Sequence, residues 1–291
     1  MTRQKAIEKL ILISAVVSVA AVCLITIFII MRGVPAISRT GLFSFLFSSR
    51  WAPGNGNYGI LALILGTLSV TLGALVLAIP TGICLSILIA EMLRGKSANI
   101  FKSGVQILAG IPSVVYGFFG VEIIIPIIRK FAVALNPNNQ TTGFSVLAGA
   151  IVLAIMILPT IVSISSNSIS SVPRRYKEAS LALGADNRET ITKVLLPAAK
   201  SGIISSIILA MGRAIGETMA VLLITGNVAQ IPHGLTSPVA TMTGVIAMEM
   251  NYATKQHQEA LFAIGIVLFV IIVILNGFAQ IIVKKLGGAS K

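Results

Sequence analysis

SSVPRRYKEASLALGADNRETITKVLLPAAK, residues 170–200, is a polar connection between two long apolar runs. Good helix formers follow Pro173, a residue type favoured in the first turn of a helix. Gly184 then ends this helix, because glycine accepts the left-handed conformation that closes helices. Asp186, followed three residues later by Glu189, resembles a capping box and predicts a second helix that runs to Pro197. The stretch therefore predicts a helix, a tight turn and a second helix.

The apolar runs on either side indicate a membrane protein. Of 291 residues, 56% are hydrophobic and 11% are charged, and the mean hydropathy is +0.97, whereas soluble domains carry about 25% charged residues. A helix needs about 20 apolar residues to cross a hydrocarbon layer about 30 Å thick. The sequence predicts an all-α membrane protein with six transmembrane helices. These spans cover residues 10–31, 59–90, 104–128, 144–166, 201–226 and 260–283.

The amino-terminal run is expected to remain as the first span. MTRQKAIEKL gives the charged start of a secretory signal, but the apolar run after it exceeds the about 7–15 residues of a signal core, and no clear cleavage site follows. We predict an N-terminal span with its outer loop at residues 1–58. A transmembrane domain with a cytoplasmic loop at 167–200 is expected to follow at residues 59–291.

Lysine and arginine are distributed unevenly between the connections. Fifteen of the 22 lie in the two termini and in the loops 91–103 and 167–200, six lie in the other three loops, and Arg213 lies within a span. By the positive-inside rule, both termini and these two loops are expected to face the cytoplasm. The outer stretch SRTGLFSFLFSSRW, residues 38–51, either rests at the lipid headgroups or is a plain surface loop.

Several other classes of protein are not supported. The net charge is +13, but the basic residues lie between apolar runs rather than on one patch, so no nucleic-acid partner is expected. Cys23 and Cys84 lie in apolar runs without metal-ligand spacing, so no disulfide or metal site is expected. GKS at residues 95–97 lacks the earlier glycine of a phosphate-binding P-loop, because Ala90 occupies that place. His257 is expected to be a surface polar residue.

GRAIGETMA, residues 212–220, places two opposite charges, Arg213 and Glu217, inside the fifth predicted span. Residues four apart share a helix face, and a charge facing lipid at this depth costs at least ~2.5–3.5 kcal/mol, so the face is expected to look inward. One interpretation is an ion pair that fixes helix packing, helped by the GxxxG spacing of Gly212 and Gly216. The other is an anion pathway, in which Arg213 offers a planar donor fork to a tetrahedral oxyanion.

The same pathway hypothesis gives roles to other polar residues. The Glu217 carboxylate accepts hydrogen bonds, so it tolerates a phosphate that carries a proton and repels sulfate, which carries none at neutral pH. Further polar candidates either line the path or bond to backbone groups freed near proline or glycine. They are Ser113, Tyr116, Thr218, Thr225 and Asn227. Glu122 is expected to be solvated or paired with a neighbouring subunit.

Residues 170–200 resemble the EAA loop of ABC importer permeases, in which Glu-Ala-Ala is followed after three residues by Gly and, after nine more, by Ile-x-Leu-Pro. The matching positions are Glu178, Ala179, Ser180, Gly184, Val194, Leu196 and Pro197. Ser180 replaces the second alanine and Val194 replaces isoleucine. The resemblance implies a coupling helix that docks on a separate ATPase subunit. A basic amphipathic hairpin lying on anionic lipid is the alternative.

Three blocks together resemble the permeases of phosphate-specific ABC importers, and the PstC subunit more than the PstA subunit. They are LAGIPSVVYGFFG (108–120), LPTIVSISSNSISSVPRRYKEASLALGA (158–185) and GRAIGETMAVLLITGN (212–227), within a similarity over roughly residues 60–283. The resemblance implies a MetI-like permease architecture in the bacterial cytoplasmic (inner) membrane. It also assigns Arg213 and Glu217 to phosphate passage.

The resemblance further implies the partners: a second, PstA-like permease, a dimer of ATPase subunits, an extracytoplasmic phosphate-binding protein and membrane lipid. The chain itself is expected to be no enzyme and to bind no cofactor, since ATP is used by the partner ATPase. Three alternatives remain open: a permease for a related oxyanion such as molybdate or sulfate, an ion-coupled secondary transporter that uses Arg213 and Glu217 as a proton relay, and a membrane scaffold.

Overall fold

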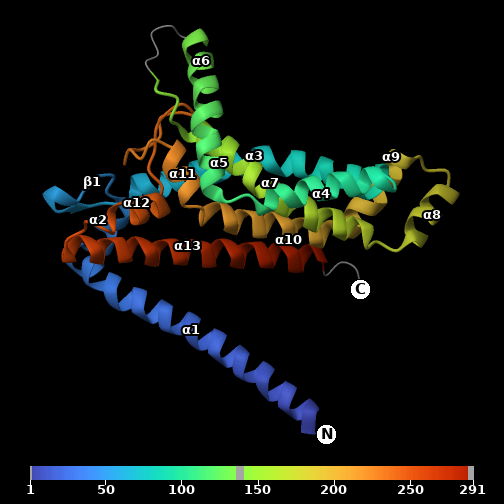
Figure 1. Cartoon of the computed structure of the whole chain (residues 1–291), viewed down its shortest axis with the longest axis horizontal. Helices are drawn as coiled ribbons and strands as arrows, with labels where there is room; N and C mark the ends of the chain where they lie inside the picture. The colour runs from blue at the N-terminus through green and yellow to red at the C-terminus, as the bar shows by residue number, and fades with distance from the viewer. Residues whose placement is uncertain (1, 136–140, 288–291) are drawn as a thin grey trace.

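Helices make up most of the described chain, residues 2–135 and 141–287 of a computed structural model (Figure 1). The hydrocarbon layer offers no water to bond with the backbone, so a spanning chain must pair its own N–H and C=O groups. A helix makes all of these hydrogen bonds within one segment. Within these residues, five helical stretches are long and apolar enough to cross a membrane: Ile7–Thr40, Leu61–Met92, Val146–Ser170, Asn187–Ile215 and Lys255–Phe278. The pair Lys96–Gly110 and Ser113–Ala134 gives a sixth candidate if counted as one broken span. The predicted all-α architecture with six spans is confirmed in this form.

The elements follow one another along the chain with few long connections. The first half contains α1 (Thr2–Thr40), α2 (Leu42–Phe47), the short strands β1 (Trp51–Ala52) and β2 (Asn57–Tyr58), α3 (Leu61–Ile87), α4 (Lys96–Gly110), α5 (Ser113–Phe119) and α6 (Ile125–Leu135). The second half contains α7 (Val146–Ser170), α8 (Arg174–Ala182), α9 (Asn187–Glu189), α10 (Leu196–Ile215), α11 (Met219–Ile224), α12 (Met242–Glu249) and α13 (Lys255–Gly287). π-Helical stretches at Leu88–Met92, Gly120–Ile124 and Thr190–Leu195 extend or join these helices.

The third predicted span is not a single straight helix. The structure bends by 95° between α4 and α5, where Ile111 and Pro112 are extended. Proline lacks the N–H that a continuing helix needs, and its ring disfavours the helical conformation of the residue before it. The prediction of one continuous helix over residues 104–128 is therefore wrong, and α6 rises away from the other helices in Figure 1.

The packed centre of the molecule is α7. In its most apolar window 61% of residues are buried within the chain, against none for α1. Small residues allow close helix contacts, as is usual in membrane bundles. A β-carbon at Gly73 would meet Ala150, one at Gly82 would meet Ile161, and one at Gly202 would meet Ser168. These contacts hold α3 and α10 directly against α7.

The two ends of the bundle differ. One end carries α2, the β1–β2 hairpin and α12, and the other carries α8 and α9; α1 begins and α13 ends toward the α8 end (Figure 1). The two termini therefore point to the same end of the molecule as the 170–200 stretch.

A partly buried polar cluster lies at the end of the bundle that carries the hairpin. The Trp51 indole donates to both carboxylate oxygens of Glu249, at 3.2 and 3.1 Å, and His257 Nε2 lies 2.7 Å from Glu249 Oε2. His257 is only 7% exposed, so the expectation that it is a surface residue is wrong. The predicted division between residues 1–58 and 59–291 stays a prediction.

Candidate functional site

Arg213 and Glu217 lie on either side of a helix break. α10 ends at Ile215 and α11 begins at Met219. The Glu217 carboxylate accepts a hydrogen bond from the Ala220 N–H at 3.2 Å, which satisfies a free donor in the first turn of α11. A side chain that bonds locally to the backbone in this way competes with a continuous helix.

The predicted continuous helix over residues 201–226 is therefore wrong, and the two charges do not share one helix face. Within residues 2–135 and 141–287 the ion pairs are Arg39–Glu259, Lys177–Glu91, Lys193–Glu189 and His257–Glu249, so Arg213 and Glu217 do not neutralise each other directly. The interpretation of the two residues as a packing ion pair loses its support.

Arg213 lies on a face of α10 that the described chain leaves open. Ser201, Leu209, Arg213 and Gly216 are all exposed along this face. A β-carbon on Gly212 would meet nothing within 4 Å, and one on Gly216 would meet only carbonyl oxygens of the preceding turn. Within the described part of the chain, no other helix therefore packs closely against Gly212 and Gly216. This face is free for contact with another chain, lipid or solvent.

Glu217 lines a narrow recess that has no room for a water molecule in this structure and whose other walls are four threonines and apolar side chains. Its neighbours there include Thr67 and Thr71 from α3 and Thr241 and Thr243 from the segment that precedes and begins α12. The Thr243 hydroxyl donates to the Glu217 carbonyl at 2.7 Å, and the Thr67 hydroxyl accepts from the Met242 N–H at 3.0 Å. These bonds fix the helix break between α3 and α12.

These four threonines were not among the residues predicted from the sequence. Thr67 and Thr71 are spaced four apart in an apolar run, a spacing that places two hydroxyls on one helix face, and this signal was available. Thr241 and Thr243 gave no comparable signal, because they lie about 175 positions from Thr67 and only folding brings them to the recess.

Among the other predicted pathway residues, several donate their side-chain hydrogen bonds to nearby backbone carbonyls. α5, which carries Ser113 and Tyr116, packs on α11, and the β-carbon position of Gly117 lies against Ala220 and Leu223. Tyr116 is buried, and its hydroxyl donates to the Leu108 carbonyl at 2.7 Å, which ties α5 to α4. The Thr218 hydroxyl donates to the Gly216 carbonyl at 3.3 Å.

Two further polar candidates bond to their own helix end. The Thr225 hydroxyl donates to the Val221 carbonyl at 2.8 Å, and the Asn227 side-chain amide donates to the Leu222 carbonyl at 2.6 Å. Both bonds match the alternative in which such residues satisfy backbone groups. Glu122 is exposed, within the π-helical stretch between α5 and α6.

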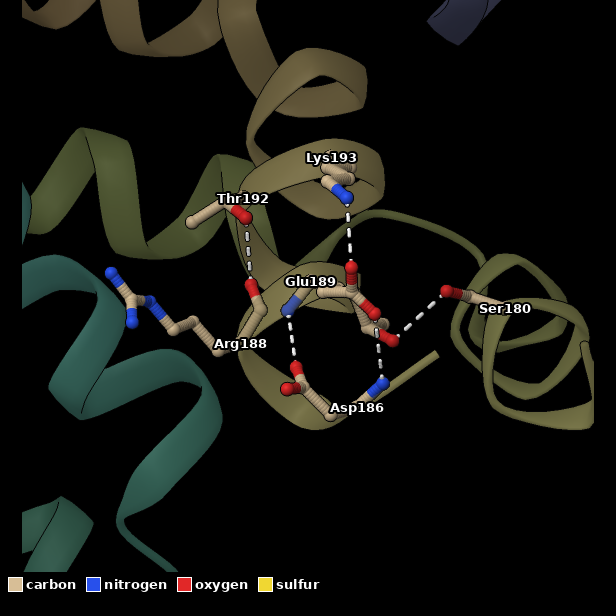
Figure 2. A network of polar contacts seen from close by, with 7 residues as sticks. Ser180, Asp186, Arg188, Glu189, Thr192 and Lys193 are labelled. Carbon is tan, nitrogen blue, oxygen red and sulfur yellow. Dashed lines mark hydrogen bonds and ion pairs between the residues drawn. The ribbon is translucent and has the colours of Figure 1, made fainter. Parts of the chain in front are cut away.

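The 170–200 stretch folds as the predicted helix, turn and helix. α8 is followed by Gly184, whose φ of +89° is the left-handed conformation, and then by the Asp186 capping box. Figure 2 shows the box: Asp186 accepts from the Glu189 N–H at 2.6 Å, and Glu189 accepts from the Asp186 N–H at 3.4 Å. The second helix does not stop at Pro197, because the Thr190–Leu195 π-helical stretch leads directly into α10.

The α8 surface suits a docking element. Glu178 and Ala179 are exposed, whereas Ser180 is buried against the helix that follows. Leu183, at the end of α8, is 89% exposed. Tyr176 and Leu181 are also exposed, so α8 presents several apolar side chains together, which is the kind of surface that marks an interaction site. Leu196 is half-buried and Pro197 exposed, at the base of α10.

Comparisons with known proteins find similar transport permeases. A family described as "Binding-protein-dependent transport system inner membrane component" matches residues 82–288. A Bacillus subtilis protein named "Probable ABC transporter permease protein YqgH" is 37% identical over 88% of this chain and 83% of its own length. The "Phosphate transport system permease protein PstC" of Mesorhizobium japonicum is 33% identical over 86% of this chain and 81% of its own.

Solved structures support the same architecture. An inward-facing structure of the MetNI methionine ABC transporter matches with a TM-score of 0.58 at 16% identity, over 78% of this chain and 97% of that chain. A crystal structure of an amino acid ABC transporter with histidines matches with a TM-score of 0.54 at 18% identity, over 78% and 92%. At this identity the likeness concerns the fold alone.

Proposed function

This chain belongs to the family of binding-protein-dependent transport system inner membrane components, and we propose that the cargo it moves is inorganic phosphate. It is a permease component and not an enzyme, and the resemblance to ABC importer permeases is confirmed. Relatives named as phosphate permeases, at 30–33% identity over most of the chain, support this cargo.

One structural observation carries the proposal: Arg213 lies on a face of α10 that its own chain leaves uncovered, in the last turn before the helix ends at Ile215. A full charge inside a membrane span is stable only beside water or a partner. A guanidinium binds a tetrahedral oxyanion through parallel N–H donors. A second permease placed against this face would enclose a pathway that contains Arg213.

Glu217 supplies the selectivity in this proposal. One of its oxygens accepts from the Ala220 N–H, and the carboxylate can also accept a hydrogen bond from the protonated oxygen of hydrogen phosphate. Sulfate offers no proton at neutral pH, so it meets only repulsion.

The proposed assembly contains a PstA-like second permease, an extracytoplasmic phosphate-binding protein and two ATPase subunits that use ATP. One ATPase subunit docks on α8 and the other docks on the second permease. Both termini and α8 face the cytoplasm in this arrangement. Alternating access between the two permeases then opens the pathway first outward and then inward.

Reconstitution tests the proposal. The chain is purified with the second permease and the ATPase, placed in liposomes with ATP inside and binding protein outside, and phosphate uptake is measured with sulfate and molybdate as competitors. We expect ATP-dependent phosphate uptake that neither competitor inhibits at equal concentration. Preferred uptake of another oxyanion would refute phosphate as the cargo, and uptake without ATP or ATPase would favour a secondary transporter.

A further inference from the structure

Two polar contacts hold α8 against the membrane-spanning helices. Lys177 forms an ion pair with Glu91, which lies in the π-helical stretch at the end of α3. The Ser180 hydroxyl lies 2.9 Å from the Thr190 hydroxyl, which begins the π-helical stretch that leads into α10. In Figure 2, Ser180 reaches from α8 toward the helix that begins at Asp186. α8 is therefore attached to the end of α3 as well as to the π-helical stretch that leads into α10.

The contact with α3 joins distant parts of the chain. Glu91 and Lys177 are 86 positions apart, and their side chains are only 12% and 33% exposed. A largely shielded, hydrogen-bonded ion pair is costly to break by removing one partner, because the other charge is left without compensation. Such a contact resists separation when α8 moves, which a solvated surface pair does not.

At its other end, α3 reaches the recess around Glu217. Thr71 lies 20 residues before Glu91, a helical distance of ~30 Å at ~1.5 Å per residue. Thr67 and Thr71 line the recess, and Thr67 accepts from the Met242 N–H. The helical stretch Leu61–Met92, which contains Pro80, thus connects α8 with the helix break.

Both attachment points fall on π-helical turns. Glu91 lies within Leu88–Met92 and Thr190 opens Thr190–Leu195. π-helical turns are rare and are frequently found at functional sites. Each π-helical turn holds an extra residue compared with an α-helical turn.

We propose that the Glu91–Lys177 ion pair is a second mechanical link of the transporter, through which displacement of α8 moves α3 and thereby the threonine-lined side of the Glu217 recess. This inference rests on the proposed function as an ATP-driven permease. Glu91 and Lys177 act as positioning residues: they touch neither phosphate nor ATP, and they make the recess change shape when the ATPase moves.

The test measures phosphate transported per ATP hydrolysed by the full complex in liposomes. In Lys177→Met and in Glu91→Gln we expect this ratio to fall by roughly fivefold or more, the lower end of coupling between linked sites, while the assembled complex still hydrolyses ATP. Combining Lys177→Glu with Glu91→Lys is expected to restore the ratio. Lys193→Met is the matched control, because Lys193 pairs with Glu189 within one helix and is 72% exposed.

Each outcome either supports or overturns the link. Single variants that keep the wild-type ratio would overturn it, as would a reversed pair that does no better than the worse single variant. If a single variant fails to assemble with the ATPase, the reversed pair is the deciding variant. Recovery of both assembly and the transport ratio supports the link, and failure to recover them overturns it. Failure of the wild-type complex to move phosphate with ATP would instead refute the proposed function.

Discussion

At the scale of single residues, Arg213 and Glu217 have separate surroundings. Arg213 is exposed on the last turn of α10, whereas Glu217 is half-buried beyond its end and bonds to the first turn of α11. Thr243 holds the Glu217 carbonyl from α12. Because the two side chains are not paired with each other, both can bind a third charged group. In a closed ion pair each charge would already be occupied.

Replacing Glu217 with glutamine tests its role in selectivity. The Glu217→Gln variant keeps an acceptor for the Ala220 N–H but removes the negative charge. Because a hydrogen bond to a charged group contributes about 1.5–3 kcal/mol, we expect phosphate uptake to fall by roughly tenfold or more. The preference for phosphate over sulfate is expected to narrow as well.

Competition between labelled phosphate and sulfate in the reconstituted complex measures both effects. Glu122→Gln makes the same chemical change at an exposed acidic residue of the α5–α6 π-helical stretch and is expected to behave as wild type. If Glu217→Gln leaves both phosphate uptake and the preference for phosphate over sulfate unchanged, the Glu217 carboxylate has no role in selectivity.

At the scale of elements, the α8–α9 hairpin depends on the backbone at one turn. Gly184 has φ +89°, and its N–H donates to the Leu181 carbonyl at 3.0 Å. A β-carbon there would meet nothing within 4 Å, so conformation rather than space restricts the position. The turn sets the direction in which α8 meets the helix that leads into α10.

Substitution of Gly184 tests this turn. Proline is locked near φ −65° and lacks the N–H, so Gly184→Pro is expected to reduce ATP hydrolysis stimulated by binding protein by roughly tenfold or more, since a misplaced proline costs ~3 kcal/mol or more. Gly184→Asn is the matched control, because asparagine tolerates the left-handed conformation, and it is expected to retain most of the activity. Equal activity of the two variants would show that the turn conformation does not matter for coupling.

At the scale of the whole molecule, the bundle has two distinct ends. The start of α1, the end of α13 and the α8–α9 hairpin lie toward one end, and the Trp51–Glu249–His257 cluster lies at the other (Figure 1). The excess of lysine and arginine at the first end predicts that it faces the cytoplasm.

Single cysteines test this orientation in a background without Cys23 and Cys84. Asn55→Cys lies in the exposed hairpin turn, and Ser97→Cys lies at the exposed start of α4. A membrane-impermeant maleimide is expected to label Asn55→Cys in intact cells and Ser97→Cys only after permeabilisation. The reverse pattern would contradict the predicted orientation.

The sequence by itself determined the membrane class, the positions of most spans and the helix–glycine–helix form of residues 170–200. These features depend on contacts within about one helical turn: apolar residues seek lipid, each helix satisfies its own backbone, and Asp186 and Glu189 cap the turn they belong to. Residues near one another in the chain carry this information, so it can be read without the fold.

Only the tertiary structure decided where the helices break and what surrounds the charges. The predicted span over residues 104–128 contained no break at Pro112, and the structure bends there by 95°, where α5 turns to pack against α11. The Thr243–Glu217 and Lys177–Glu91 contacts join residues 26 and 86 positions apart. Such contacts form when separate helices pack together, and no local pattern of residues specifies which polar groups will then meet.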